Sequence, residues 1–297
     1  MITGILVVNE FLHLNKFNEI HRWLLDAAKR QNIELQLKTN AELIMDITGA
    51  DHPDKFADFI LFWDKDVKLA YYLEQLGYPV YNSSKAIGIC DDKSLTHLTL
   101  MNQGIPMPRT IVAPKTFDNI GYTNYHFLQN IADRIGFPMV VKECFGSFGQ
   151  QVYLVHNYEE LQSQVKQCGM KPLIFQEFVK TSYGRDIRLQ VVGKQVIASM
   201  YRYSEDHDFR ANLSIGGKMK QYQPTQIQCE LALRSCEIIG LDFAGVDLLL
   251  GENDEPIVCE VNSNAHFKNI YDCTGVNAAD EIITYIKNQL QAKTLSN

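Results

Sequence analysis

The sequence predicts a chain of two parts, an α/β part with a parallel sheet followed by an α+β part with a mostly antiparallel sheet. Up to about residue 81, apolar runs of strand length alternate with segments of helical periodicity, which is typical of a parallel sheet covered by helices. After about residue 173, alternating strands are joined by short hairpin turns instead. The 297 residues amount to about two domains of ordinary size, so we expect a cleft between domains.

The first part alternates strands and helices. Its first strand, over residues 4–8, is an uninterrupted apolar run, as expected of a buried parallel strand. The elements that follow are a helix over 17–27, strands over 33–37 and 58–63, a helix over 69–76 and an extended piece over 78–81. The first strand is followed by Val8-Asn9-Glu10-Phe11 and not by a glycine-rich turn, so a dinucleotide fingerprint is absent. We interpret this part as a substrate-side or scaffold domain.

The second part begins with a helix over 91–101, which Gly104 closes. Another helix is expected to begin at Asn157, because Asn157 and Glu160 have the spacing of a capping box. Further helices are predicted over 226–239 and 277–290, and strands of one mostly antiparallel sheet over 173–179, 186–192, 195–203, 245–250 and 256–261.

Composition excludes several classes of protein. The 28 basic and 35 acidic residues give a net charge of −7, which argues against a nucleic-acid partner but is compatible with a small basic pocket. No run approaches the ~20 apolar residues that span a bilayer, and the N-terminal residues lack the pattern of a signal peptide. The seven cysteines are scattered without a C-x-x-C pair, as is typical of reduced thiols in a cytoplasmic protein.

A lysine followed by a glycine loop is the first candidate site. Lys142 ends an apolar strand, and a loop containing Gly146, Ser147 and Gly149 precedes the next strand. Backbone N–H groups of such a loop can surround phosphate oxygens while the lysine supplies a fixed positive charge. The alternative is an ordinary hairpin turn. The loop is not a P-loop, because no G-K-[ST] follows it.

Acidic and amide side chains within two C-terminal strands form the second candidate. Glu260 and Asn262 are two residues apart and share one strand face. If the two strands pair as a hairpin, Asp247 lies across from them. Two carboxylates and an amide oxygen suit Mg²⁺ that keeps several waters and bridges nucleotide phosphates. The alternative, that these residues face solvent at a sheet edge, fits poorly with their apolar neighbours.

Arginines form the third candidate. Strand alternation puts Asp186 and Arg188 on one face, and Arg202, Arg210 and Asn212 add polar groups from the next strand and loop. Each charge alone is compatible with a solvated face. Next to an acidic metal site, however, such cations are what phosphoryl transfer requires.

With these motifs in place, the chain from about Asp91 to its end resembles the ATP-grasp ligases of the RimK type, which join a carboxylate to an amine using ATP. The matching stretches follow one another in the family's order over some 200 residues: Asp92-Lys93, Gly104 to Pro108, Val140 to Lys142, Gly146 to Gly149, Gln176 to Phe178, Asp186 to Arg188, Asp208 to Leu213, Gly216-Gly217, Ala244 to Asp247, and Glu260 to Asn262. The resemblance implies an ATP-grasp fold with a preceding α/β domain. The expected divisions are 1–89 for that domain, 90–172 for a central lobe and 173–297 for a C-terminal lobe.

The resemblance also implies roles for individual residues. The nucleotide is expected to contact Lys93, Lys142, Gly146, Ser147, Gly149, Gln176, Glu177, Phe178, Asp186, Arg210 and Asn212. Mg²⁺ or Mn²⁺, as two ions, is expected at Asp247, Glu260 and Asn262. Arg188, Arg202 and Arg210 are the expected catalytic cations. The expected reaction passes through an acyl phosphate and releases ADP and phosphate.

The chain departs from the RimK pattern at Gln151, which replaces a third glycine of the phosphate loop, and in two places near the second substrate, where Ser214-Ile215 and residues 263–269 stand. Its Phe267-Lys268-Asn269 is similar to ligases that act on an amino-group carrier protein in lysine biosynthesis. Both places are expected to set the choice of second substrate. His207 and His266 are candidate bases, although a loop histidine is typically a surface residue.

The expected partners are ATP, a carboxylate and an amine, which is an amino acid, a peptide or a protein terminus. Assembly of the chain into a homo-oligomer is left open. Addition of an amino acid to a protein or peptide acceptor is the first expectation. A ligase of free amino acids or small metabolites and a non-catalytic nucleotide-binding partner protein are the alternatives.

Overall fold

The N-terminal domain is a parallel sheet with helices on its faces, as predicted. The computed structural model describes residues 1–48, 56–117, 119–147, 149–206, 208–213 and 216–296. The sheet has the order β2-β1-β3-β4 and all its pairings are parallel. Its strands are β1 (Ile2–Val8), β2 (Ile33–Thr39), β3 (Phe59–Phe62) and β4 (Val80–Tyr81), and its helices are α1 (Asn15–Arg30) and α2 (Val67–Gln75).

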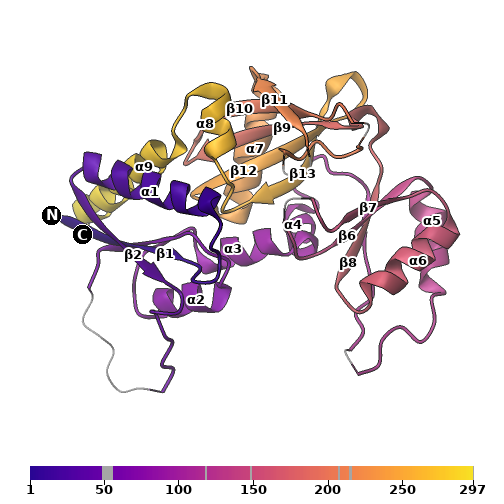
Figure 1. The fold of residues 1–297 in the computed structure, drawn as a ribbon, viewed down its shortest axis with the longest axis horizontal. Coiled ribbons are helices and arrows are strands. Elements are labelled where there is room, and N and C mark those ends of the chain that lie inside the picture. Colours follow the sequence, from indigo (N-terminus) through magenta and orange to yellow (C-terminus); the bar gives the residue numbers. More distant parts are fainter. Residues whose placement is uncertain (49–55, 118, 148, 207, 214–215, 297) are drawn as a thin grey trace.

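The C-terminal helix completes this domain. Helix α9 (Ala278–Ser296) lies beside α1 (Figure 1), and its Ile282, Ile283 and Ile286 pack into one core with Leu24 of α1. The predicted helix therefore exists, but its apolar face covers the N-terminal sheet. The first and last segments of the chain form one packed unit.

The central lobe is a separate antiparallel sheet with the order β5-β8-β6-β7. Its elements are β5 (Thr110–Val112), α5 (Phe127–Ile135), β6 (Met139–Glu143), β7 (Val152–Val155), α6 (Tyr158–Cys168) and β8 (Leu173–Glu177). Helix α6 begins as predicted, because Asn157 accepts a hydrogen bond from the backbone of Glu160.

One expectation about this lobe is wrong. Strand β8 does not belong to the C-terminal sheet, because it pairs with β5 and β6. The central lobe therefore reaches to Glu177, beyond the expected boundary at residue 172. In Figure 1 this lobe lies at the opposite end of the molecule from the N-terminal domain.

The C-terminal lobe lies between those two ends and carries a five-stranded sheet with the order β11-β10-β9-β12-β13. Its strands are β9 (Arg185–Val192), β10 (Gln195–Tyr203), β11 (Lys218–Gln221), β12 (Phe243–Leu250) and β13 (Pro256–Asn262). The remaining elements are α3 (Ser84–Asp91), α4 (Lys93–Leu100), the short turn η1 (Lys180–Ser182), α7 (Gln226–Ile239), η3 (Glu252–Asp254) and α8 (Lys268–Thr274). Alternation along β9 buries Ile187, Leu189 and Val191 on the core side and turns the charged residues to the other face.

Asn82 joins the N-terminal domain to the C-terminal lobe. Its side chain is fully buried and donates to the backbone carbonyls of Phe243 and Ser263, at 2.9 and 3.0 Å. Its oxygen accepts from the backbone N–H groups of Asp242 and Phe243. Because the amide satisfies backbone groups of both β12 and the loop after β13, it fixes where that loop meets the N-terminal domain.

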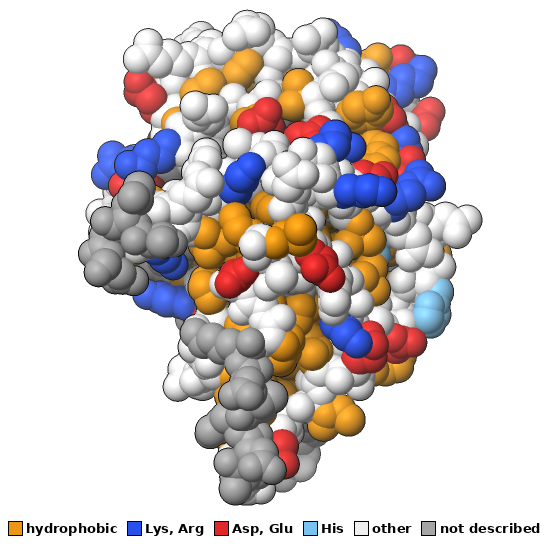
Figure 2. All heavy atoms as spheres, turned by 90° about the vertical axis from the view of Figure 1, so that its left-hand side faces the viewer, with side chains coloured by type: hydrophobic (Ala, Val, Ile, Leu, Met, Phe, Trp, Pro, Cys, Tyr) orange, Lys and Arg blue, Asp and Glu red, His pale blue; other side chains and the backbone are white. Residues whose placement is uncertain are grey.

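The surface of the N-terminal end carries charges of both signs. Figure 2 shows Lys and Arg side chains interspersed with acidic ones, with hydrophobic side chains between them, and no continuous basic field on this face among the residues drawn in colour. Within the ranges that the structure describes, no helix is both long and apolar enough to cross a membrane.

Candidate active site

A cavity of about 450 Å³ lies where the three parts of the chain meet. It is lined by the glycine loop, the ends of β6 and β8, the exposed face of β9, β12 and β13, and residues of the N-terminal domain. All the residues predicted for the nucleotide and the metal line it, as do the three predicted catalytic arginines. The structure therefore brings the predicted site together, whereas the role of each residue stays a prediction.

The cavity is basic although the chain is acidic. Nine cationic and four anionic side chains line it, whereas the whole chain has a net charge of −7. The cations are Lys16, Lys65, Lys93, Lys142, Arg185, Arg188, Arg202, Arg210 and Lys268, and the anions are Glu177, Asp186, Asp247 and Glu260. A concave cluster of cations on an otherwise acidic protein concentrates a polyanionic ligand at that point.

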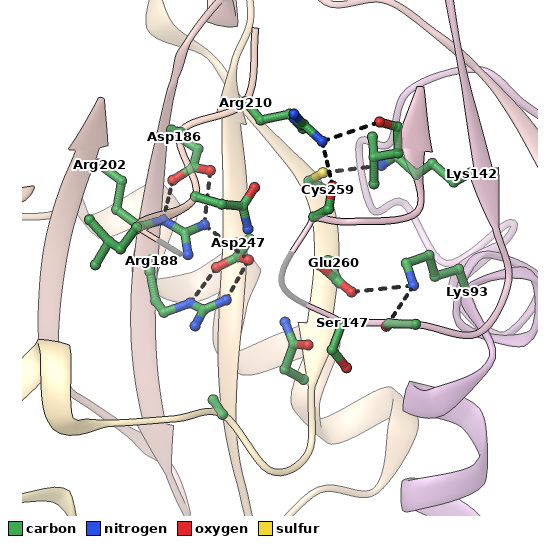
Figure 3. Close-up of a pocket in the computed structure, with 18 of the residues that line it drawn as sticks. Lys93, Lys142, Ser147, Asp186, Arg188, Arg202, Arg210, Asp247, Cys259 and Glu260 are labelled. Atoms are coloured by element: carbon green, nitrogen blue, oxygen red, sulfur yellow. Dashed lines mark hydrogen bonds and ion pairs between the residues drawn. The ribbon is translucent and has the colours of Figure 1, made fainter. Parts of the chain in front are cut away.

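A buried cluster of two arginines and two aspartates forms the floor of the cavity (Figure 3). Arg188 donates to both oxygens of Asp247, at 2.6 Å each. Arg202 donates to both oxygens of Asp186, at 2.6 and 2.8 Å, and also lies 3.0 Å from Asp247. These are paired residues of neighbouring strands, so the sheet register fixes their geometry.

The two guanidinium groups determine the charge state of Asp247. Burial opposes ionisation of this carboxyl group, but Arg188 and Arg202 outweigh burial and hold its pKa below the ordinary value. Asp247 is therefore a fixed anion at neutral pH. Asp186, which is expected to contact the nucleotide, lies in this cluster, where both its oxygens accept from Arg202.

The predicted metal residues lie together, as the hairpin prediction requires. Asp247 is paired directly with Glu260 across β12 and β13, and Asn262 follows on the same strand. The side-chain nitrogen of Asn262 is buried without a hydrogen-bond partner in the described part of the chain, so this donor is left unsatisfied beside the two carboxylates.

The predicted donors are of the hard-oxygen kind that Mg²⁺ prefers, although both oxygens of Asp247 already accept from Arg188. Among the residues placed by the structure, no group of three or more His, Cys, Asp or Glu could hold a metal, but Mg²⁺ keeps several waters and needs only one or two carboxylates. Glu260 is partly exposed to the cavity and lies 3.8 Å from the ammonium of Lys93. Two carboxylates and an amide thus remain the residues that would hold the ion.

Lys142 is a buried cation without an acidic partner. Its side chain projects from β6, is 9% exposed, and lies 3.6 Å from the thiol of Cys259. Within the described ranges it forms no ion pair with a carboxylate. Because an unpaired buried charge is costly, this lysine indicates that an anion occupies the cavity when the site is loaded.

The glycine loop is held from all three parts of the chain. Lys93 donates to the carbonyl of Gly146 at 3.2 Å, and Lys65 of the N-terminal domain lies 3.3 Å from the hydroxyl of Ser147. Arg210 donates to the carbonyl of Gly149 at 2.7 Å while pairing with Asp208. The predicted catalytic Arg210 therefore joins the loop to the C-terminal lobe.

Gly149 allows the glycine loop to lie close to the C-terminal lobe. Its φ of 72° lies in the left-handed region, and a Cβ there would lie 2.8 Å from the side-chain oxygen of Asn212. A larger residue would push the loop away from the C-terminal lobe.

The cavity also has apolar lining residues from the central and C-terminal lobes, among them Val140, Phe178, Met200, Phe209 and Leu249. Of these, Phe178 and Phe209 meet edge to face. The buried Gln176 side-chain nitrogen lies 2.8 Å from Nε2 of His97 and 2.8 Å from the hydroxyl of Thr110. Burial, with a contribution from Lys142, lowers the pKa of His97 to about 4. His97 is therefore neutral at pH 7 and can accept from Gln176, which fixes the orientation of the amide.

Four residues of the N-terminal domain line the cavity and were not predicted individually: Lys16, Phe17, Trp63 and Lys65. Trp63 and Lys65 could have been predicted from the sequence. They follow the buried parallel strand β3, and ligands bind at the carboxyl ends of such strands. Their presence supports the interpretation of this domain as the substrate side.

The segment of residues 263–269 also lines the cavity. His266 is not a surface residue as a loop histidine is expected to be, because its ring lines the cavity and reaches the carbonyl of Lys16. The other candidate base, His207, and the predicted specificity residues Ser214 and Ile215 lie outside the described residues.

Comparison with known proteins decides the family. Residues 90–286 match the RimK-like ATP-grasp domain. The chain belongs to the RimK-like ATP-grasp family. It is accordingly an ATP-dependent ligase that forms carbon–nitrogen bonds, and the non-catalytic alternative is not supported.

Named relatives and a solved structure agree with this assignment. N-acetylaspartylglutamate synthase A of Homo sapiens is 35% identical over 207 residues, which are 69% of this chain and 51% of that protein. Beta-citrylglutamate synthase B of Danio rerio is 31% identical over 233 residues, 77% of this chain and 56% of that protein. The chain thus spans about half the length of these two synthases. The RimK domain ATP-grasp protein of Sphaerobacter thermophilus has the same fold, with a TM-score of 0.72, 20% identity, and coverage of 95% of this chain and 98% of that one.

Proposed function

We propose that this RimK-like ligase joins a small-molecule carboxylate to the amino group of a free amino acid, with glutamate as the first candidate. The observation that carries the proposal is the basic cavity, in which the buried Lys142 has no acidic partner. The names of the two synthases support a small-molecule carboxylate and glutamate over a protein acceptor.

In the proposed reaction, a carboxylate oxygen attacks the γ-phosphorus of ATP and ADP leaves. The amine then attacks the carbonyl carbon of the acyl phosphate, and phosphate leaves. Two Mg²⁺ or Mn²⁺ ions, held by Asp247, Glu260 and Asn262, supply neutralisation of the terminal phosphates when bound. Lys93, Lys142 and the Gly146–Gly149 loop hold the phosphates, and the apolar lining residues, with Gln176, Glu177 and Phe178, receive the base.

The two arginines of the floor have different proposed roles. Arg188 has 14% of its side chain exposed and meets the substrate carboxylate and its acyl phosphate. Arg202 is 4% exposed and holds Asp186 and Asp247 in position. Both add positive charge where phosphoryl transfer develops negative charge.

A two-dimensional substrate screen tests the proposal. Phosphate release is measured with N-acetylaspartate, citrate and other small carboxylates, each paired with glutamate and other amino acids, and products are identified by mass. We expect release that requires both substrates. If phosphate release requires a peptide or protein, the acceptor is a protein or peptide and not a small molecule. If no pair of substrates supports phosphate release, the proposal is contradicted.

A further inference from the structure

The side chain of His266 is held in place by several contacts at the proposed substrate side of the cavity. Its Nε2 lies 3.1 Å from the backbone carbonyl oxygen of Lys16, and its ring meets Phe17 edge to face with 5.9 Å between centroids. The next residue, Phe267, is fully buried in the core beside Trp63. The ring is thus held by the N-terminal domain, and the backbone that follows it is anchored in the core, although His266 belongs to a loop.

The hydrogen bond to Lys16 determines the tautomer. A carbonyl oxygen can only accept, so Nε2 must carry the proton and donate it. In the neutral ring the lone pair then belongs to Nδ1. Nδ1 has no hydrogen-bond partner among the residues that the structure describes, so it is available to a ligand in the cavity.

His266 and Arg188 line the same cavity, and the packing around Gly245 brings the residue before His266 close to Arg188. A Cβ on Gly245 would lie 2.5 Å from the Cβ of Ala265 and 3.6 Å from Nε of Arg188. The residue before His266 and the guanidinium of Arg188 therefore pack against the same glycine. A nucleophile approaching a carboxylate held by Arg188 comes within reach of the 263–269 segment.

The charges that face the ring keep it neutral. Burial is the main cause that lowers the pKa of His266; the hydrogen bond to Lys16 and the carboxylate of Glu19 oppose it, and the cations of Lys16 and Arg188 add to it. An imidazole with a lowered pKa is unprotonated at neutral pH and free to take a proton.

We propose that His266 is the general base of the amide-forming step, with Nδ1 accepting a proton from the attacking amine. This rests on the proposed function. The amine nitrogen carries three protons as an ammonium ion and one in the amide. Nδ1 takes one proton from the ammonium ion before the attack, which frees the nitrogen lone pair to form the C–N bond, and then passes that proton to water. The other departing proton leaves with the phosphate, whose bond to the carbonyl carbon breaks with its electron pair.

The test separates the two half-reactions. Hydroxylamine is unprotonated at neutral pH and needs no base, so hydroxamate formation reports the acyl phosphate alone. His266→Gln keeps a donor for the Lys16 carbonyl but removes the base. We expect its hydroxamate rate to equal that of the unmodified protein, and its rate of amide formation with an amino acid to fall about 100-fold at pH 7. The acidic limb of the pH profile of amide formation should also disappear.

His156 provides the matched control, because its side chain is exposed at the start of α6 and outside the cavity. His156→Gln should change neither rate. If His266→Gln lowers hydroxamate and amide formation together, or neither, His266 is not the base although the ligase assignment stands. If the unmodified protein releases AMP, the proposed function fails, and the base with it.

Discussion

The nucleotide side and the substrate side of the cavity are held in different ways. The proposed nucleotide side comprises Lys93, Lys142, the Gly146–Gly149 loop, Gln176–Phe178 and the proposed metal residues, and it rests mainly on paired strands. The substrate side comprises Lys16, Phe17, Trp63, Lys65 and the 263–269 segment, and it rests on contacts between the N-terminal domain and a loop. Asn264 and His266, for example, each bind a backbone carbonyl of the N-terminal domain.

The difference indicates which side of this cavity can change its substrate without altering the proposed chemistry. Sheet register fixes Asp247 opposite Glu260 and beside Arg188, so a substitution there disturbs the geometry proposed for phosphoryl transfer. The substrate side can change residue by residue, because its backbone is anchored separately by Asn82 and Phe267. Variants on the two sides should therefore affect different steps.

The largest effect is expected on the nucleotide side. Glu260→Gln should lower turnover at least about 100-fold, because a metal carboxylate is lost without a change in size. The melting temperature should stay unchanged. The matched control is Glu255→Gln, on the exposed hairpin before β13. This variant should release ADP at the rate of the unmodified protein. Near-normal turnover of Glu260→Gln at ordinary magnesium concentration would remove Glu260 from the metal site.

Lys142→Met should separate binding from folding. We expect nucleotide affinity, measured by calorimetry, to weaken about 10-fold or more because a charged phosphate contact is lost. The melting temperature should stay level or rise, since an unpaired buried charge is removed. Lys115→Met, at an exposed position, should change neither quantity. Unaltered affinity in Lys142→Met would mean that this lysine does not face the phosphates.

The smallest effect concerns pH. His97 lies behind the nucleotide side with its pKa lowered from 6.5 to about 4. The unfolded chain therefore binds a proton that the folded chain does not between these values, and stability falls as the pH drops from about 6.5 toward 4. At pH 5 the contribution is at most roughly 2 kcal/mol. His97→Gln should reduce the loss of melting temperature between pH 7 and pH 5; an equal loss in both proteins would assign the effect to other groups.

The same contrast explains what the sequence could predict. Asp247, Glu260 and Asn262 were predictable because strand alternation and one hairpin turn determine their faces. Strand β8 was assigned to the wrong sheet because its partner β6 lies upstream and not in the next segment. His266 was expected at the surface because loop histidines usually lie there. Its contact with Lys16 could not be predicted, since the two residues are 250 positions apart in the sequence. Local patterns identify strands and their faces, whereas contacts between distant segments appear only in the folded chain.

Transfer of oxygen from the carboxylate to phosphate tests the central claim most directly. The carboxylate substrate that supports turnover is labelled with oxygen-18 in its carboxyl group, and the phosphorus-containing products are analysed by mass. An acyl-phosphate ligase must leave one labelled oxygen in inorganic phosphate while ATP becomes ADP, because the attacking carboxylate oxygen departs with the γ-phosphoryl group. Label in AMP, with pyrophosphate as the second product, would contradict the account.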